Sequence, residues 1–249
     1  MKIIWQIRER DVRKIKDFFN HHKDNPFVKN RISRNVEKSA PKVTKEIFWE
    51  AMISCLLTTQ QRSGPDSAVT RFICTNPFPL NYSACSSQTD LSNFVSKTIS
   101  DFGGLRRANK IADAVSDNLE WLENSGWHRI FRMADSLEDN EKIEIERESA
   151  EYIDDHLKGF GPKQARNLLQ SLGLTRNEIP VDSRIIKWLN DFGFPIRLSS
   201  AGLTDKNYYN FILDGLQQLC ERSGVYPCVL DAAIFSSFDT EWSEDRLIW

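Results

Sequence analysis

Lys163 and Asp182 are the side chains of this sequence whose type and position best suit chemistry, because each stands at the start of a short predicted helix. The positive end of a helix dipole disfavours an ammonium, so we expect a lowered pKa for Lys163, and a neutral lysine amine is a nucleophile. Asp182 occupies the N-cap position of its helix. Taken singly, the two residues have ordinary interpretations as a solvated surface lysine and a helix cap.

The glycine turn Gly159-Phe160-Gly161 lies just before Lys163, and Pro162 then opens a helical run that Gly173 ends. Glycines let the backbone approach a ligand closely, and the N–H groups at a helix start attract anions. This turn can therefore hold a phosphate without a charged side chain. Such a contact positions a nucleic acid but does not read its sequence. Alone, a glycine turn before a helix is a weak signal, since most are ordinary connections.

Together, the glycine turn, Lys163 and Pro180-Val181-Asp182 resemble the helix-hairpin-helix and Gly/Pro-Asp signature of the HhH-GPD DNA glycosylase superfamily. The specific part of the resemblance is residues 157–189, in which Asp182 follows Lys163 by 19 residues. This spacing between lysine and aspartate is similar to the one in the bifunctional branch of the superfamily, which includes 8-oxoguanine glycosylases. The resemblance implies that Lys163 attacks the sugar C1′ as a Schiff-base nucleophile and that Asp182 is the essential carboxylate that assists base departure.

Polar residues end the apolar helix predicted over residues 45–61, and the resemblance makes them candidates for DNA contact. The sequence LLTTQQ is similar to the LLSAQ-type pattern, which in the superfamily supplies a polar residue that fills the gap left by an extruded base. Gln60 is thus implied as this wedge, Gln61 as the second choice, and Arg62 as a contact to a phosphate or the orphaned base. An amide can hydrogen-bond to unpaired base edges. The alternative that these polar residues simply end the helix stays open.

Three further residues become candidates through the resemblance. Arg184 lies two residues beyond Asp182, where relatives often place a polar phosphate contact. Asn167 lies one helical turn beyond Lys163 and is expected to line the base pocket. Short archaeal-type 8-oxoguanine glycosylases use a C-terminal residue, commonly lysine, to recognise the damaged base, whereas this chain ends in Trp249. Trp249 could stack on a base or dock on the core as a plug.

Apolar residues at helical spacing predict an all-α protein. The resemblance implies two intertwined helical subdomains with the helix-hairpin-helix motif at the cleft between them. We divide the chain into an N-terminal helix and mobile basic arm (1–43), a glycosylase core (44–237) and a C-terminal tail (238–249). The segment before the hairpin is expected to pack with the N-terminal and C-terminal helices, and the central helices to form the other subdomain.

The five cysteines are an odd number without CxxC spacing, which argues against a disulfide framework and a zinc ribbon. Some members of the superfamily carry a C-terminal four-cysteine iron–sulfur cluster. Only Cys220 and Cys228 fall in the matching region of this chain. We therefore expect no metal and no cofactor.

The net charge of −2 does not by itself point to a nucleic-acid partner. Its distribution is uneven, because residues 1–45 hold thirteen Lys and Arg against five Asp and Glu, whereas residues 135–151 hold two against eight. This asymmetry predicts a positively charged face that binds double-stranded DNA and an acidic face on the opposite side of the molecule. Each charged run taken alone is typical of a solvated helix. We find no membrane span or signal-peptide core, and expect an intracellular monomer, cytoplasmic and nucleoid-associated in a prokaryote.

The sequence thus predicts a base-excision-repair DNA glycosylase with AP lyase activity that acts on damaged duplex DNA. Within the superfamily that this chain resembles, the lysine implies oxidative damage as the target, and the missing cluster implies 8-oxoguanine rather than the substrates of the endonuclease III branch. Two alternatives stay open, a glycosylase for another lesion such as an oxidised pyrimidine and a non-catalytic helix-hairpin-helix DNA-binding module. Such a module needs the glycine turn but neither Lys163 nor Asp182.

Overall fold

The computed structural model describes residues 4–140, 142–239 and 241–243. Within these ranges every regular element is a helix and none is a strand, which confirms the all-α prediction. The α-helices are α1 (Glu9–His22), α2 (Pro26–Arg31), α3 (Lys45–Leu57), α4 (Ala68–Ile73), α5 (Tyr82–Ser86), α6 (Leu91–Phe102), α7 (Ala108–Trp121), α8 (Trp127–Asp139), α9 (Ile143–His156), α10 (Pro162–Ser171), α11 (Ser183–Phe192), α12 (Lys206–Ser223) and α13 (Pro227–Phe238). Two π-helical segments, η1 (Ile32–Val36) and η2 (Leu122–Gly126), and one 3-10 segment, η3 (Ser200–Thr204), complete the set.

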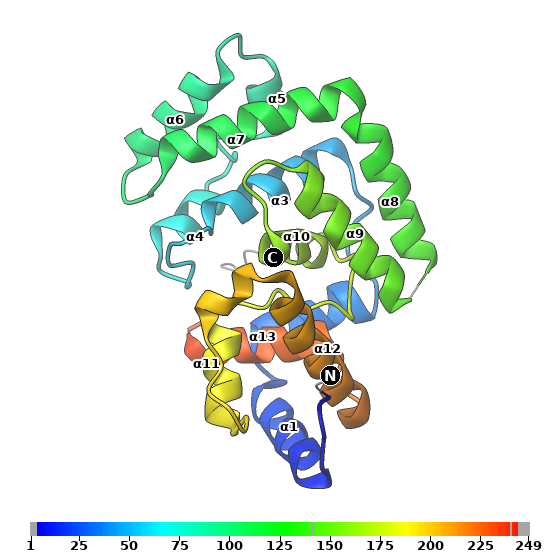
Figure 1. The fold of residues 1–249 in the computed structure, drawn as a ribbon. Coiled ribbons are helices and arrows are strands. Elements are labelled where there is room, and N and C mark those ends of the chain that lie inside the picture. The colour runs from blue at the N-terminus through cyan, green and yellow to red at the C-terminus, as the bar shows by residue number, and fades with distance from the viewer. Residues whose placement is uncertain (1–3, 141, 240, 244–249) are drawn as a thin grey trace.

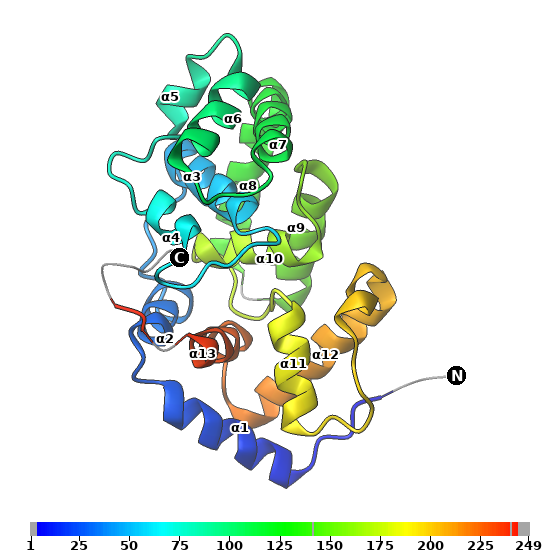
Figure 2. The ribbon, with the colours of Figure 1, turned by 90° about the vertical axis from the view of Figure 1, so that its left-hand side faces the viewer.

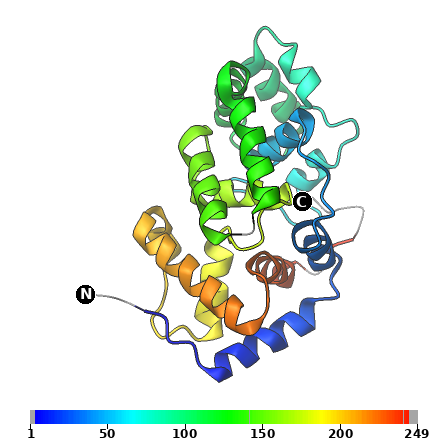
Figure 3. The same ribbon diagram turned by 90° about the vertical axis from the view of Figure 1, so that its right-hand side faces the viewer.

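The helices enclose two hydrophobic cores, one above the other in Figure 1. The first core is built by α3 to α10, and the second by α1, α2 and α11 to α13. The chain passes from the first to the second core through residues 172–182, which we call the α10–α11 segment; Figure 3 shows the same two bodies from the side. Two helical subdomains are therefore present, as predicted.

Helix α9 belongs to a different core from the one predicted. Ala150 and Ile153 are completely buried among the residues of the first core. The expectation that the segment before the hairpin packs with the N-terminal and C-terminal helices is therefore wrong. The chain leaves the first core only after α10. Ile179 and Val181 are the first residues beyond the hairpin whose side chains lie in the second core.

The predicted basic arm is a packed part of the second core. Within residues 21–42, α2 and η1 form regular helix, and the Arg31 side chain is only 2% exposed. Arg34 Nη2 donates to the carbonyl oxygen of Ser171 over 2.6 Å, and Asn35 Nδ2 donates to that of Gln170 over 2.9 Å. These contacts hold the segment against the end of α10, so it is not a mobile arm. Val36 still packs against the second core and Val43 belongs to the first, so the chain crosses from the second core to the first between these two residues.

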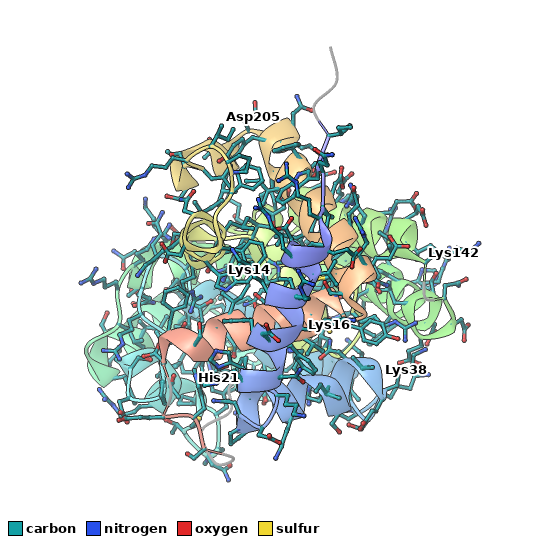
Figure 4. The ribbon with its side chains drawn as sticks, turned by 90° about the horizontal axis from the view of Figure 1, so that it is seen from below. Lys14, Lys16, His21, Lys38, Lys142 and Asp205 are labelled. Carbon is teal, nitrogen blue, oxygen red and sulfur yellow. The ribbon has the colours of Figure 1, made fainter. Side chains whose placement is uncertain are left out.

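Helix α1 crosses the underside of the molecule, beneath α13, as Figure 4 shows with Lys14, Lys16 and His21 labelled along it. Lys14 Nζ donates to the carbonyl oxygen of Phe192 over 2.9 Å and so ties α1 to the end of α11. The positive charge of α1 therefore lies on the underside. Within the described residues, no helix has the length and apolar character needed to cross a bilayer.

Helix α3 ends at Leu57, four residues before the end predicted from its apolar pattern. The Thr58 hydroxyl donates to the carbonyl oxygen of Cys55 over 2.9 Å, and Gln60 adopts a left-handed φ of 56°. Both features turn the backbone out of the helix, since side-chain bonds to the backbone compete with helical ones. The residues that follow form the rim of a cleft.

Candidate active site

The hairpin between α9 and α10 is fixed from behind by α7. Asn118 of α7 accepts from Lys158 N over 2.7 Å and donates to Lys158 O over 3.1 Å. Gly159 has a φ of +82°, and a Cβ there would stand 2.8 Å from Leu56 Cδ2. Gly161 has extended backbone, and a Cβ there would meet no atom within 4 Å. The two glycines therefore differ, since Gly159 allows packing and a left-handed turn, while Gly161 faces open space.

An open cleft of about 930 Å³ lies where the hairpin, the rim after α3 and the second core meet. Figure 2 shows α10 between α3 above and α13 below. The residues that line the cleft come from the rim, the loop after α6, the starts of α10 and α11, and the end of α13; they include Thr58, Thr59, Gln60, Gln61, Arg62, Ser63, Gly104, Arg106, Lys163, Gln164, Asp182, Ser183, Arg184 and Asp239. The cleft thus brings together residues from distant parts of the chain.

Lys163 lies in the first turn of α10 and lines the cleft. Burial lowers the pKa of its ammonium, the Asp182 carboxylate acts to raise it, and the Arg184 guanidinium lowers it further. The net direction is downward, as predicted, but the leading cause is loss of water rather than the helix dipole. Nζ also donates to Gln164 Oε1 over 3.2 Å. A lowered pKa increases the fraction of nucleophilic neutral amine.

Asp182 caps α11 as predicted. Its Oδ1 accepts from the backbone N–H groups of Arg184, over 2.8 Å, and Ile185, over 3.2 Å. Burial acts to raise the pKa of its carboxyl, but the charges of Arg184 and Lys163 outweigh this effect and lower it. Asp182 is therefore held as a carboxylate beside the lysine.

Arg184 lies on Asp182 rather than in open solvent. Its Nη2 is 3.0 Å from Asp182 Oδ2, and its guanidinium carbon lies 4.3 Å from the centre of the Phe235 ring. In this position it neutralises the carboxylate and lines the cleft. The implied phosphate contact would require the guanidinium to leave these partners or to bridge them to the DNA.

A narrow recess of about 20 Å³ adjoins the cleft beneath Lys163. Asn167 lines it, and Asn167 Nδ2 lies 3.7 Å from Cys55 Sγ. Burial raises the pKa of the Cys55 thiol to about 12. The thiol therefore stays protonated near neutral pH, which makes it a poor nucleophile.

Two charged side chains of the recess were missed by the sequence analysis. Asp231 of α13 and Arg31 of α2 both line it. Burial raises the pKa of Asp231 to about 6, although the charge of Arg31 opposes this. A signal was present, because Asp231 is the one charged residue in the apolar run 225–238.

The three candidate DNA contacts after α3 have different environments. Gln60 is exposed on the cleft in its left-handed conformation. Gln61 is tied down, because its Oε1 accepts from Arg106 N over 2.9 Å and its Nε2 donates to Leu57 O. Arg62 is 74% exposed and forms a 3.2 Å ion pair with Asp239. Gln60 is thus the freer of the two amides, and Trp249 lies outside the described residues.

Comparison with solved structures identifies the fold. The protein superposes on the 8-oxoguanine DNA glycosylase of Methanocaldococcus jannaschii with a TM-score of 0.62 and 18% identity, over 92% of this chain and 94% of that one. For the 8-oxoguanine DNA glycosylase of Thermotoga maritima the TM-score is 0.64 and the identity 16%, over 92% and 96%. The chain has the fold of these glycosylases. No protein-family model and no curated protein sequence matches it.

A third superposition relates this glycosylase fold to a complex with nucleic acid. The Methanocaldococcus jannaschii 8-oxoguanine glycosylase/lyase bound to a 15mer DNA containing 8-oxoguanine matches with a TM-score of 0.61 and 16% identity, over 90% of this chain and 96% of that one. The glycosylase fold therefore spans nearly the whole chain. At these identities the likeness concerns the fold, and the chemistry has to be argued from the residues of the cleft.

Proposed function

We propose that this protein is a base-excision-repair DNA glycosylase with AP lyase activity, which removes 8-oxoguanine from duplex DNA through a Schiff base on Lys163. The observation that carries the proposal is the placement of Lys163 and Asp182 at the starts of two helices that meet in one cleft. Their pKa values are both shifted in the direction the chemistry needs, toward a neutral amine and an ionised carboxylate. A non-catalytic DNA-binding module has no need of this pair.

DNA binding is assigned to the hairpin and the rim of the cleft. The N–H groups in the first turn of α10 have no partners within the helix, and Gly161 lets a phosphate approach them. Arg62 and Arg106 add positive charge at the rim. Gln60 stands exposed there, and an amide in this place can occupy the gap in the duplex after a nucleotide has been extruded.

The chemical step uses the pair directly. The neutral amine of Lys163 adds to C1′ of the extruded nucleotide as the bond to the base breaks, and the base leaves with its bonding electrons and takes up a proton. The ionised Asp182 stabilises the positive charge that develops on the sugar. Proton loss from the amine and opening of the sugar ring give the Schiff base, which then allows β-elimination of the 3′ phosphate.

The recess supports an oxidised purine as the substrate. A carboxylate only accepts hydrogen bonds, so Asp231 favours a base edge that carries an additional N–H. 8-Oxoguanine carries N–H at position 7, where guanine offers an acceptor. The recess is too small for a base until Arg184 and Phe235, which lie in contact across it, separate. Entry of the base would then bring C1′ toward Lys163.

A cleavage assay on a panel of duplexes tests the proposal. The duplexes contain 8-oxoguanine, thymine glycol or no damage, and alkali treatment separates base release from lyase cleavage. We expect wild type to cut the 8-oxoguanine strand without alkali, and the Lys163→Gln and Asp182→Asn variants to lose base release. Preferred cleavage at thymine glycol would replace the lesion assignment with an oxidised pyrimidine. Binding without base release from any duplex would favour a non-catalytic module.

A further inference from the structure

The α10–α11 segment connects the helix that carries Lys163 to the helix start that carries Asp182. Lys163 lies at the start of α10, whereas Asp182 lies at the end of this segment, 19 residues further along the chain. The segment has no regular secondary structure in residues 174–182. A loop of this kind holds a carboxylate in one place only if other elements fix its backbone and side chains.

A buried ion pair joins the segment to α10. Arg166 Nε donates to Glu178 Oε2 over 2.6 Å, and the two side chains are 2% and 0% exposed. The same guanidinium donates through Nη1 to the carbonyl oxygen of Pro162 over 3.0 Å, next to Lys163. Gln170 Nε2 also donates to Glu178 O over 2.7 Å. One guanidinium therefore connects the first turn of α10 with a residue four positions before Asp182.

Helix α9 holds the segment from a second side. The Glu146 carboxylate, 2% exposed, accepts from three consecutive backbone N–H groups of residues 176–178, at 3.2, 2.7 and 3.1 Å. Arg147 Nε lies 3.4 Å from Glu178 Oε1. Both oxygens of the Glu178 carboxylate are thus paired with cations, and the backbone beside it is bound by a second carboxylate.

Helix α12 holds the segment from a third side. Gln217 Nε2 donates to Asn177 O over 2.8 Å and to Glu178 Oε1 over 2.9 Å. The Tyr209 hydroxyl accepts from Val181 N over 3.0 Å and donates to Ile179 O over 3.3 Å. Val181 is the residue before Asp182. The segment is therefore bound by side chains of α9, α10 and α12 up to the position at which Asp182 begins α11.

Stability alone is a poor explanation for the Arg166–Glu178 pair. Taking two charges out of water is costly, and well-packed apolar side chains of similar volume are often as stable as a buried ion pair or more so. What such a pair supplies, and apolar packing does not, is a directional contact between specified atoms. The contact here connects the two halves of the proposed site.

We propose that Arg166 and Glu178 are positioning residues that hold the Asp182 carboxylate at its working distance from the Lys163 amine. This inference rests on the proposed function for its meaning, but the geometry that it concerns can be measured in the protein without DNA. Neither residue lines the cleft, so both act through Lys163 and Asp182.

The first test measures the titration of Lys163 in DNA-free protein by NMR of its side chain. The groups that act on this amine are Asp182, Arg184, Cys55 and Asp231, and among them Asp182 raises its pKa most. In Glu178→Gln the Asp182 carboxylate is no longer held close, so we expect the titration midpoint to fall and the neutral fraction to rise about threefold or more at a given pH. Glu151→Gln, which removes the same charge from a half-buried α9 partner of Lys206, should titrate as wild type.

The second test measures single-turnover base release and, separately, binding of lesion DNA. A small displacement of a reacting group costs about 10²-fold in rate, so we expect Glu178→Gln to lose about tenfold to 10²-fold in rate while the dissociation constant stays within about twofold. Arg166→Lys keeps the charge but cannot reach Pro162 O and Glu178 together, and it should show the same pattern more weakly. Arg166→Lys decides the question if Glu178→Gln fails to fold.

The outcomes separate this inference from the proposed function. A lowered Lys163 midpoint together with a slower rate and unchanged binding supports positioning. An unchanged midpoint in a folded variant overturns it, and so does a rate loss matched by equally weakened binding. If wild type itself releases no base, the proposed function fails, while the midpoint in DNA-free protein still shows whether the pair sets the Lys163–Asp182 geometry.

Discussion

The groups around Lys163 shift the pKa of its amine in opposite directions. Burial and Arg184 lower its pKa, while the Asp182 carboxylate raises it. Arg184 also pairs with Asp182 at 3.0 Å, so one guanidinium keeps the carboxylate ionised and the amine easier to deprotonate. The pKa of the amine therefore depends on Asp182 and Arg184 as well as on its own burial.

The pH dependence of Schiff-base formation should reflect this arrangement. Because the neutral amine is the proposed nucleophile and its pKa is lowered, the rate should rise with pH and level off below the ordinary lysine value of about 10.5. Replacing Arg184 by Gln removes a charge that lowers this pKa, so the profile should move to higher pH. Arg129→Gln on α8, which contributes nothing to the cleft, is the control. A profile that does not move would show that Arg184 does not act on the amine.

Two replacements of Asp182 should separate its structural role from its chemical role. An Asn side chain can still cap α11 through its oxygen, so Asp182→Asn should unfold near the wild-type temperature but release no base. Asp182→Ala loses the cap as well and should be less stable by about 1 kcal/mol. Thermal unfolding and the cleavage assay measure the two effects. Base release by Asp182→Asn at the wild-type rate would remove the carboxylate from the mechanism.

At the scale of elements, the two glycines of the hairpin have different surroundings. Gly159 is in a left-handed conformation with Leu56 and Ala114 beside it, so its role is within the protein. Gly161 precedes the first turn of α10 and borders open space. The sequence analysis gave both glycines the same phosphate-binding role, because a pattern of residue types contains no information on which side of the turn is covered.

The two alanine variants of the hairpin should therefore behave differently. Gly159→Ala combines a left-handed backbone with a contact of 2.8 Å to Leu56 and should lower the free energy of unfolding by about 1–2 kcal/mol. Gly161→Ala has room and should unfold like wild type, but its methyl group should weaken DNA binding. Denaturant unfolding and DNA titration distinguish them. Equal effects of both replacements on stability would contradict the assignment.

At the scale of the whole molecule, the cleft is formed where two cores meet, and the Arg62–Asp239 pair joins them at its mouth. Arg62 follows α3 of the first core and Asp239 follows α13 of the second. The pair is exposed on the arginine side, so it adds little to stability. If the cleft binds DNA as proposed, the pair competes with it, because Asp239 occupies a guanidinium that a phosphate could bind.

Replacing each partner of this pair should change DNA affinity in opposite directions. Arg62→Gln should weaken binding to all duplexes and reduce the salt dependence by about one phosphate contact. Asp239→Asn frees Arg62 and should tighten binding. Both variants should unfold as wild type does, and binding titrations at several salt concentrations provide the measurement. An unchanged affinity in Asp239→Asn would show that Arg62 makes no contact with DNA.

The sequence predicted best the local features that depend only on residues adjacent in the chain. The turn before Lys163 and the cap at Asp182 depend on their immediate neighbours, and both are present. Arg31, Asp231 and Glu178 escaped prediction because their roles arise only when α2, α13 and the α10–α11 segment pack together. The same limit explains the supposed basic arm, in which Arg31 and Arg34 bind partners that are more than a hundred residues away along the chain.

The most direct test of the central claim is borohydride trapping on a duplex with a single 8-oxoguanine, with wild type and Lys163→Gln side by side. Borohydride reduces a Schiff base to a stable covalent link between protein and DNA. We predict a covalent adduct with wild type and none with Lys163→Gln. An adduct that persists in the variant would assign the nucleophile to another residue, and no adduct with wild type would contradict Schiff-base removal of 8-oxoguanine.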